Sequence, residues 1–212
     1  TAGAFWVEER STDEDAALFA AQFGGSINVT EESNFDLYAA TGYFEFTHLQ
    51  DKTTPTPGAD NAAVGGAYIG EYQIFNLSLE ATMEPQILDE EVPLFGGKLP
   101  MRLFYDYVNN VAGTRAGGDA GFLVGFSVGK TSEFLDTRVT YNYRELDSDA
   151  VVAAFAPTMF GEATNCRGHK LTFDVNLVPG CVTGGHISYG ERDVANQDKD
   201  YGEVGVHFIA KF

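Results

Sequence analysis

The stretch Tyr201-Gly-Glu-Val-Gly-Val-His-Phe-Ile-Ala-Lys-Phe212 decides how the rest of the chain is interpreted, because its apolar and polar residues alternate. One face takes Val204, Val206, Phe208, Ala210 and Phe212, and the other takes Glu203, Gly205, His207, Ile209 and Lys211. Successive side chains of a β-strand point to opposite faces, so this alternation predicts a strand with one apolar and one mostly polar face.

The same alternation recurs upstream and predicts about ten strands in a single domain that spans residues 1–212. The predicted strands are residues 3–10, 18–30, 35–49, 67–82, 100–109, 121–130, 135–144, 171–177, 182–192 and 201–212. Within residues 35–49 the apolar positions change parity, because Phe35 and Leu37 are followed by Phe44 and Phe46. An extra residue in a strand produces such a change, so we expect a β-bulge near Thr41-Gly42.

The predicted connections alternate between short turns and long polar loops. The short turns are residues 31–34, 131–133 and 178–181, and the long connections are residues 11–17, 51–66, 112–119, 145–169 and 193–200. Transmembrane β-barrels alternate short periplasmic turns with longer external loops in the same way. The segment 84–99 departs from this rule, because it is long and yet falls on the side of the short turns.

Composition excludes several classes of protein. Charged residues make up 21% of the 212 residues and aromatic residues 13%, which is not the composition of a disordered chain. No run of about 18 apolar residues is present, so we expect no transmembrane helix, although a β-barrel would lack such a run as well. The first residues lack the basic and apolar regions of a signal peptide, so we expect a mature, an N-terminally truncated or a cytosolic chain.

The formal net charge of −18 repels phosphate backbones, so we predict no nucleic-acid partner. Such a charge favours solubility, and it also enriches cations near the protein.

The two cysteines, Cys166 and Cys181, are separated largely by one predicted strand. A strand rises about 3.3 Å per residue, and a disulfide needs Cα atoms within about 7 Å, so we predict no bridge between them. Cys166-x-x-His169 is half of a metal-binding pattern without a second half. We therefore predict no metal site and no cofactor.

The two faces of the predicted strands define candidate site residues. Charged and polar residues in mid-strand are expected to line a water-filled lumen, and they are Glu80, Arg102, Asp106, Asp136, Arg138, Arg144, Asp174, His186 and His207. Residues of the apolar face are expected to contact lipid, and they are Phe23, Phe75, Leu103, Phe126, Val139, Phe173, Phe208 and Phe212. A soluble β-sandwich or lectin-like module is the alternative, because alternation alone does not distinguish lipid from a second sheet. Tyrosines near strand ends, such as Tyr107 and Tyr143, favour the membrane, where aromatic residues form interfacial girdles.

Several stretches resemble a porin family of Gram-negative outer-membrane β-barrel proteins. They are LSLEATMEPQ (77–86), MRLFYDYVNN (101–110), GFLVGFSVGK (121–130), VTYNYRELDSDAVVAAF (139–155), NCRGHKLTFDVNLVPG (165–180) and the terminal strand that ends in Phe212. The resemblance implies an all-β, antiparallel transmembrane barrel in the bacterial outer membrane, monomeric or homotrimeric, in contact with lipid and lipopolysaccharide. Such porins are usually much longer, so the chain is either a compact barrel of about ten strands or the C-terminal part of a larger one.

The function that these observations predict is a diffusion channel for small hydrophilic solutes or ions. Acidic loops predict a weak preference for cations, and the inward arginines are expected to form a cross-strand ladder with neighbouring acids. A structural or adhesive barrel without an open pore is the alternative. An enzyme would need a convergent group such as Ser188, His186 and Asp174, and a lumen network of hydrogen bonds explains these residues better, so we predict no catalytic residues.

Overall fold

The computed structural model describes residues 1–11, 13–30, 34–53, 61, 63–64, 66–85, 99–112, 118–157, 163–178, 180–194 and 197–210. The predicted lipid-facing Phe212 and most of the segment 84–99 lie outside these residues.

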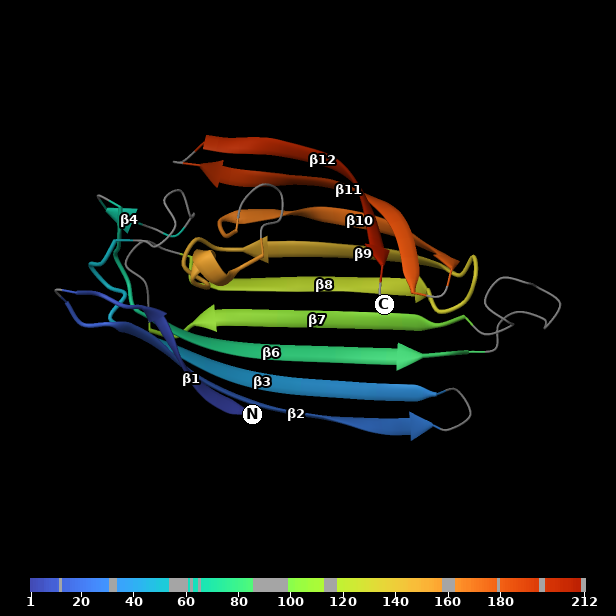
Figure 1. Ribbon diagram of the computed structural model, residues 1–212, viewed down its shortest axis with the longest axis horizontal. Coiled ribbons are helices and arrows are strands. Elements are labelled where there is room, and N and C mark those ends of the chain that lie inside the picture. The colour runs from blue at the N-terminus through green and yellow to red at the C-terminus, as the bar shows by residue number, and fades with distance from the viewer. Residues whose placement is uncertain are drawn as a thin grey trace.

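The fold is all-β (Figure 1). Its strands are β1 (Ala2–Glu8), β2 (Ala16–Thr30), β3 (Phe35–Thr47), β4 (Ala63–Val64), β5 (Ala67–Tyr68), β6 (Tyr72–Met83), β7 (Met101–Asn110), β8 (Ala120–Gly129), β9 (Thr137–Leu146), β10 (Cys166–Val178), β11 (Cys181–Val194) and β12 (Gln197–Ala210). One turn of 3-10 helix, η2 (Ala153–Phe155), follows β9. Within the described residues, no helix has the length and apolarity that crossing a membrane requires.

Ten of these strands form one antiparallel sheet in the order β1-β2-β3-β6-β7-β8-β9-β10-β11-β12. Each strand pairs with its neighbour in chain order, apart from the hairpin β4–β5, which confirms the predicted number of strands and their antiparallel order. The predicted long loop 193–200 is wrong, because Asp193 pairs with Asp198 and Val194 with Gln197. The small hairpin β4–β5 is separate from this sheet and lies in the connection between β3 and β6. The predicted strand 67–82 combined β5 and β6, which are two separate strands in the structure.

The sheet is curved but open, so the expectation of a closed barrel is not met in this structure. In Figure 1 it runs from β1 at one edge to β12 at the other, and no pairing joins these two strands in the described part of the chain. Alternation of side chains decides which residues share a face, whereas closure also requires a particular tilt and stagger of the strands.

The predicted bulge at Thr41-Gly42 is wrong. β3 keeps continuous register with β2 through Gln22–Gly42 and with β6 through Gly42–Asn76, and the β2–β3 pair shifts only between Asn28 and Thr30. Phe44 and Phe46 therefore sit on the same face as the polar residues of the neighbouring strands.

The hydrophobic core lies at the end of the sheet that carries the long connections. It is formed by Ala16, Phe46, Leu49, Tyr68, Tyr72, Ile74 and Val152. The connection after β9 folds back onto the sheet here and brings Val152 into contact with residues of β3 and β6. We call residues 147–157 of this connection the roof segment. Burial, with a smaller contribution from Glu8, raises the pKa of Tyr68 to about 12.

Cys166 and Cys181 begin adjacent strands, but antiparallel pairing places Cys166 opposite Arg192 and Cys181 opposite Val178. The two residues thus lie at opposite ends of the β10–β11 pair and form no disulfide with each other.

Candidate functional site: the polar face of the sheet

Strand register divides the predicted site residues between two faces of the sheet. Glu80, Arg102, Asp106, Arg138, Arg144, Asp174, His186 and His207 share one face, which we call the polar face. Phe23, Phe75, Leu103, Phe126, Val139, Phe173 and Phe208 share the opposite face, which we call the apolar face, and each is at least 37% exposed. Side chains of the polar face from β2 to β9 line one cavity beneath the roof segment.

Asp136 lies in the turn before β9 instead of on the strand wall. Its Oδ2 accepts hydrogen bonds from the Ser132 N–H, the Ser132 hydroxyl and the Glu133 N–H, at 3.1, 3.1 and 2.8 Å. Burial alone would raise the pKa of Asp136, but these hydrogen bonds outweigh burial and hold the pKa below its usual value. The structure therefore gives this residue a role in the β8–β9 turn.

Two of the inward arginines form the expected cross-strand pairs with acids. Arg102 Nη2 lies 2.5 Å from Glu80 Oε2, and Arg138 Nη2 lies 2.8 Å from Asp174 Oδ2. Asp106 instead accepts a hydrogen bond of 2.5 Å from the Ser78 hydroxyl. Paired charges of this kind stiffen the wall and leave little net charge on it.

Asp174 is also hydrogen-bonded to His207, across the strand that lies between them. His207 Nε2 donates to Asp174 Oδ1 at 2.8 Å, so β10 and β12 are joined over β11. The strand in between has Gly184 at this point, where a Cβ would lie 2.7 Å from Asp174 Oδ1 and 2.8 Å from His207 Nε2. The absence of a side chain at Gly184 is what makes this contact possible.

The residues considered as a catalytic group are not arranged as one. His186 Nε2 lies 3.5 Å from Glu203 Oε1, and the recorded partner of His207 is Asp174. No hydrogen bond between Ser188 and either histidine is found among the described contacts. The described residues also contain no group of three or more His, Cys, Asp or Glu residues placed to hold a metal ion.

Arg144 differs from the other inward arginines, and the expected ladder does not include it. Its side chain is buried, with 6% of the residue exposed, and it donates to the backbone carbonyls of Pro157, at 3.0 Å, and Ala163. Arg144 therefore fastens the connection after β9 to the polar face.

The sequence pattern missed the other residues that hold this connection in place. Asn61 donates to the carbonyls of Ser148 and Val151 at 2.6 and 2.7 Å and accepts from the Ala153 N–H at 2.7 Å. The Tyr72 hydroxyl donates to Asp149 Oδ1 at 2.9 Å. These partners are far apart in the sequence and belong to stretches without periodicity, so only the buried, hydrogen-bonded state of Asn61 reveals its role.

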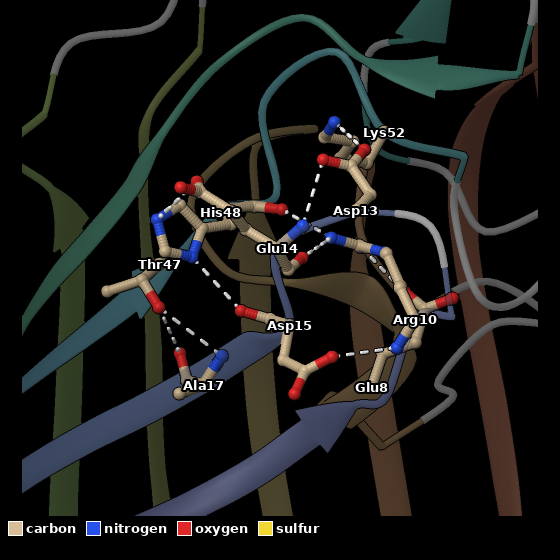
Figure 2. A network of polar contacts seen from close by, with 9 residues as sticks. All are labelled: Glu8, Arg10, Asp13, Glu14, Asp15, Ala17, Thr47, His48 and Lys52. Carbon is tan, nitrogen blue, oxygen red and sulfur yellow. Dashed lines mark hydrogen bonds and ion pairs between the residues drawn. The ribbon is translucent and has the colours of Figure 1, made fainter.

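A second polar network forms the rim beside β1, β2 and β3 (Figure 2). Arg10 lies 2.6 Å from Glu8 and donates to the carbonyls of Glu14 and His48 at 3.1 and 2.9 Å. Asp13 pairs with Lys52, and the hydrogen bonds from Lys52 and from the Glu14 N–H hold the pKa of Asp13 below its usual value. The rim thus ties the β1–β2 connection to the end of β3.

Tyrosines on the apolar face lie toward the long connections, with acidic residues just beyond them. Tyr43, Tyr143 and Tyr189 are each followed two positions later by a glutamate on the same face, namely Glu45, Glu145 and Glu191. The Tyr143 hydroxyl donates to Glu145 at 3.0 Å, and its ring lies 4.9 Å from the ring of His169. An aromatic row bordered by charges is the arrangement found at the boundary between an apolar and an aqueous phase.

The chain matches no family model, no curated protein and no solved structure. The resemblance to the porin family stays a prediction, and any proposal about function rests on the two faces of this ten-stranded antiparallel sheet.

Proposed function

We propose that the chain forms the wall of an outer-membrane β-barrel channel for small hydrophilic solutes or ions, with a weak preference for cations. In this proposal the apolar face contacts lipid, the polar face lines the lumen, and the long connections lie on the outer side of the membrane.

The observation that carries the proposal is the exposure of the apolar face. Large apolar side chains on it remain exposed from one end of the sheet to the other, for example Phe23 at 81%, Phe173 at 50% and Val206 at 89%. Soluble monomers rarely expose an apolar patch of more than a few hundred Å². A lipid phase satisfies such a face, and the second sheet of a soluble sandwich is not found in the described part of the chain.

The open edges of the sheet fit this proposal only if they are paired. Unpaired backbone N–H and C=O groups cost several kcal/mol each in hydrocarbon, which is why membrane-spanning sheets close. We therefore propose a barrel in which β1 and β12 pair either with each other or with other strands.

The charge distribution supports selectivity for cations. Arg102 and Arg138 are paired with acids on the wall, whereas the long connections carry Asp13, Glu14, Asp51, Asp119 and Asp147. A ring of negative charge concentrates counter-ions within about 8–10 Å at physiological salt. The preference is therefore expected to be strongest at low ionic strength.

Planar-bilayer recording tests the proposal. We expect discrete conductance steps and a reversal potential that indicates cation preference under a KCl gradient. Arg102→Ala releases Glu80 on the lumen wall and is expected to increase the preference. Arg167→Ala is the matched control, because Arg167 forms a similar pair with Glu191, at 2.5 Å, on the opposite face.

A structural barrel without an open pore is the second candidate, and the roof segment favours it, because this segment covers part of the polar face. Stable insertion of the protein without conductance steps would support that alternative. Anion preference at low salt, or equal effects of Arg102→Ala and Arg167→Ala, would contradict the proposed lumen wall.

A further inference from the structure

The polar face contains an apolar cavity that a water-filled lumen does not need. The cavity has a volume of about 520 Å³ and lies between the roof segment and the ends of the strands that carry the long connections. Its walls include Phe44 and Phe46 from β3, Ile74 from β6, Leu123 from β8 and Phe155 from η2. Cavities of about 300–1,000 Å³ with mostly apolar walls are typical of small-molecule binding sites.

The cavity is a built site, because buried polar groups hold its roof. Arg144 and Asn61, with 6% of each residue exposed, bind four roof-segment groups: the carbonyls of Pro157, Ser148 and Val151 and the N–H of Ala153. Collapse of the roof onto the strands would leave these buried groups without hydrogen-bond partners, so the roof resists collapse. Figure 1 shows the gold coil of η2 against the ends of β8 and β9.

One side of the cavity has an opening. The ring of Phe155 stacks on Phe46, with centroids 5.7 Å apart and planes inclined by 29°, and yet 58% of Phe155 stays exposed. An aromatic ring half in contact with the cavity wall and half in solvent marks the entrance, and it offers an apolar molecule a flat first contact.

The few polar groups at the wall do not favour a charged occupant. The described hydrogen bonds of Arg144 go to backbone carbonyls, and Asp106 accepts from Ser78 at 2.5 Å. An anion entering the cavity would meet the Asp106 carboxylate and a protein of net charge −18. Burying a charge against the Phe, Ile and Leu side chains that make up most of the wall is costly, whereas an uncharged apolar molecule gains free energy there.

We propose that this cavity binds a small, uncharged apolar molecule, of the size and chemistry of a monoaromatic hydrocarbon. The inference concerns the cavity itself and holds whether or not the sheet closes around a conducting pore.

Photolabelling of the intact protein in lipid vesicles tests it, with the neutral probe 3-trifluoromethyl-3-phenyldiazirine. Peptide mapping by mass spectrometry locates the label. We expect label on β3 and on the roof segment that an excess of toluene suppresses, because a cavity saturates. Label on the apolar face, if that face contacts lipid, is not expected to be suppressed, because lipid does not saturate at these concentrations.

The matched variants are Leu123→Trp, which fills the cavity, and Val124→Trp, which places the same ring on the opposite face of β8. We expect suppressible labelling to weaken about tenfold or more in Leu123→Trp and to stay unchanged in Val124→Trp. Val108→Phe on the cavity wall is a smaller step that replaces Leu123→Trp if that variant does not fold.

Three results would test separately whether the cavity binds a molecule, whether that molecule is uncharged, and whether the apolar face contacts lipid. Label on the roof segment that toluene does not suppress, or equal effects of the two Trp variants, would overturn the binding site. Stronger competition by benzoate or benzylammonium than by toluene would overturn the uncharged class. Absence of label on the apolar face would contradict the proposed lipid contact and leave the cavity result intact.

Discussion

Replacing Leu171 by arginine distinguishes a lipid-facing surface from a solvent-facing one. Leu171 lies near the middle of β10 on the apolar face, between Tyr141 and Ile187 of the neighbouring strands, and is 48% exposed. In water, a substitution at such an exposed site changes the free energy of unfolding by no more than about 0.5 kcal/mol. At the centre of a bilayer, arginine costs about 2–4 kcal/mol, which corresponds to about 30-fold or more in the folding equilibrium.

The control is Thr172→Arg, because the next residue of the same strand points to the polar face, which already carries Lys170. Both variants are unfolded reversibly with urea in lipid vesicles, and the fluorescence of Trp6, the single tryptophan, reports the transition. We expect Leu171→Arg to lose about 2–4 kcal/mol and Thr172→Arg to lose less than about 1 kcal/mol. Similar losses in the two variants would refute the assignment of the faces.

Three further predictions concern stability. Gly184→Ala is expected to lower the free energy of unfolding by about 1–3 kcal/mol, because the new Cβ would intrude on the hydrogen bond between Asp174 and His207. Gly202→Ala is the control, because open space surrounds Gly202, and it is expected to cost less. The midpoints of urea unfolding compare the two variants. The pKa of Asp136 is lower in the folded state than in the unfolded state. Ionised Asp136 therefore stabilises the fold fully above its unfolded pKa of about 3.9, and this stabilisation is lost as the pH falls below that value. Asp136→Asn is expected to reduce the loss of unfolding free energy at acid pH. If the unfolding free energy of Asp136→Asn fell with acid pH as steeply as that of the unchanged protein, the proposed role of Asp136 in the β8–β9 turn would be contradicted. Asn61→Ala removes three of the hydrogen bonds that hold the roof segment and is expected to increase proteolysis within residues 147–157. Unchanged cleavage would show that the bonds from Arg144 and Tyr72 suffice.

Alternation in the sequence was sufficient to predict the strands and most of the face assignments. The pairs Arg102–Glu80 and Arg138–Asp174 could be expected from the register. Arg138 lies directly opposite Asp174, and Arg102 lies diagonal to Glu80 on the same face, because its direct partner is Thr82. The curvature and the open edges could not be expected, because tilt and stagger of strands depend on contacts along the whole sheet. Arg144 has the same parity as Arg138, so the sequence predicts a similar pair with an acid. The fold of the connection after β9 instead brings backbone carbonyls to Arg144, and the sequence pattern does not predict this fold.

The assignment of Phe44 and Phe46 shows why local pattern is insufficient for the cavity. Two apolar residues that break parity have the same sequence signature whether the strand contains a bulge or the polar face contains an apolar patch. The register of β2 and β6 decides between the two, because both neighbours pair with β3 without a shift around Gly42. Both phenylalanines therefore line the cavity. A bulge at Gly42 would have turned their side chains to the apolar face.

The same register assigns Glu45 to the apolar face and thereby sharpens the proposed lipid boundary. Glu45 lies two positions beyond Tyr43 toward the long connections, as Glu145 lies beyond Tyr143 on the other side of the sheet centre. With a bulge at Gly42, Glu45 would have pointed to the polar face and the repetition would have been lost. If the apolar face contacts lipid as proposed, the apolar phase ends at the tyrosines, because aromatic side chains favour the interface and carboxylates favour water. The cavity lies level with this row, because Phe44 and Arg144 of its wall directly follow Tyr43 and Tyr143 in the chain.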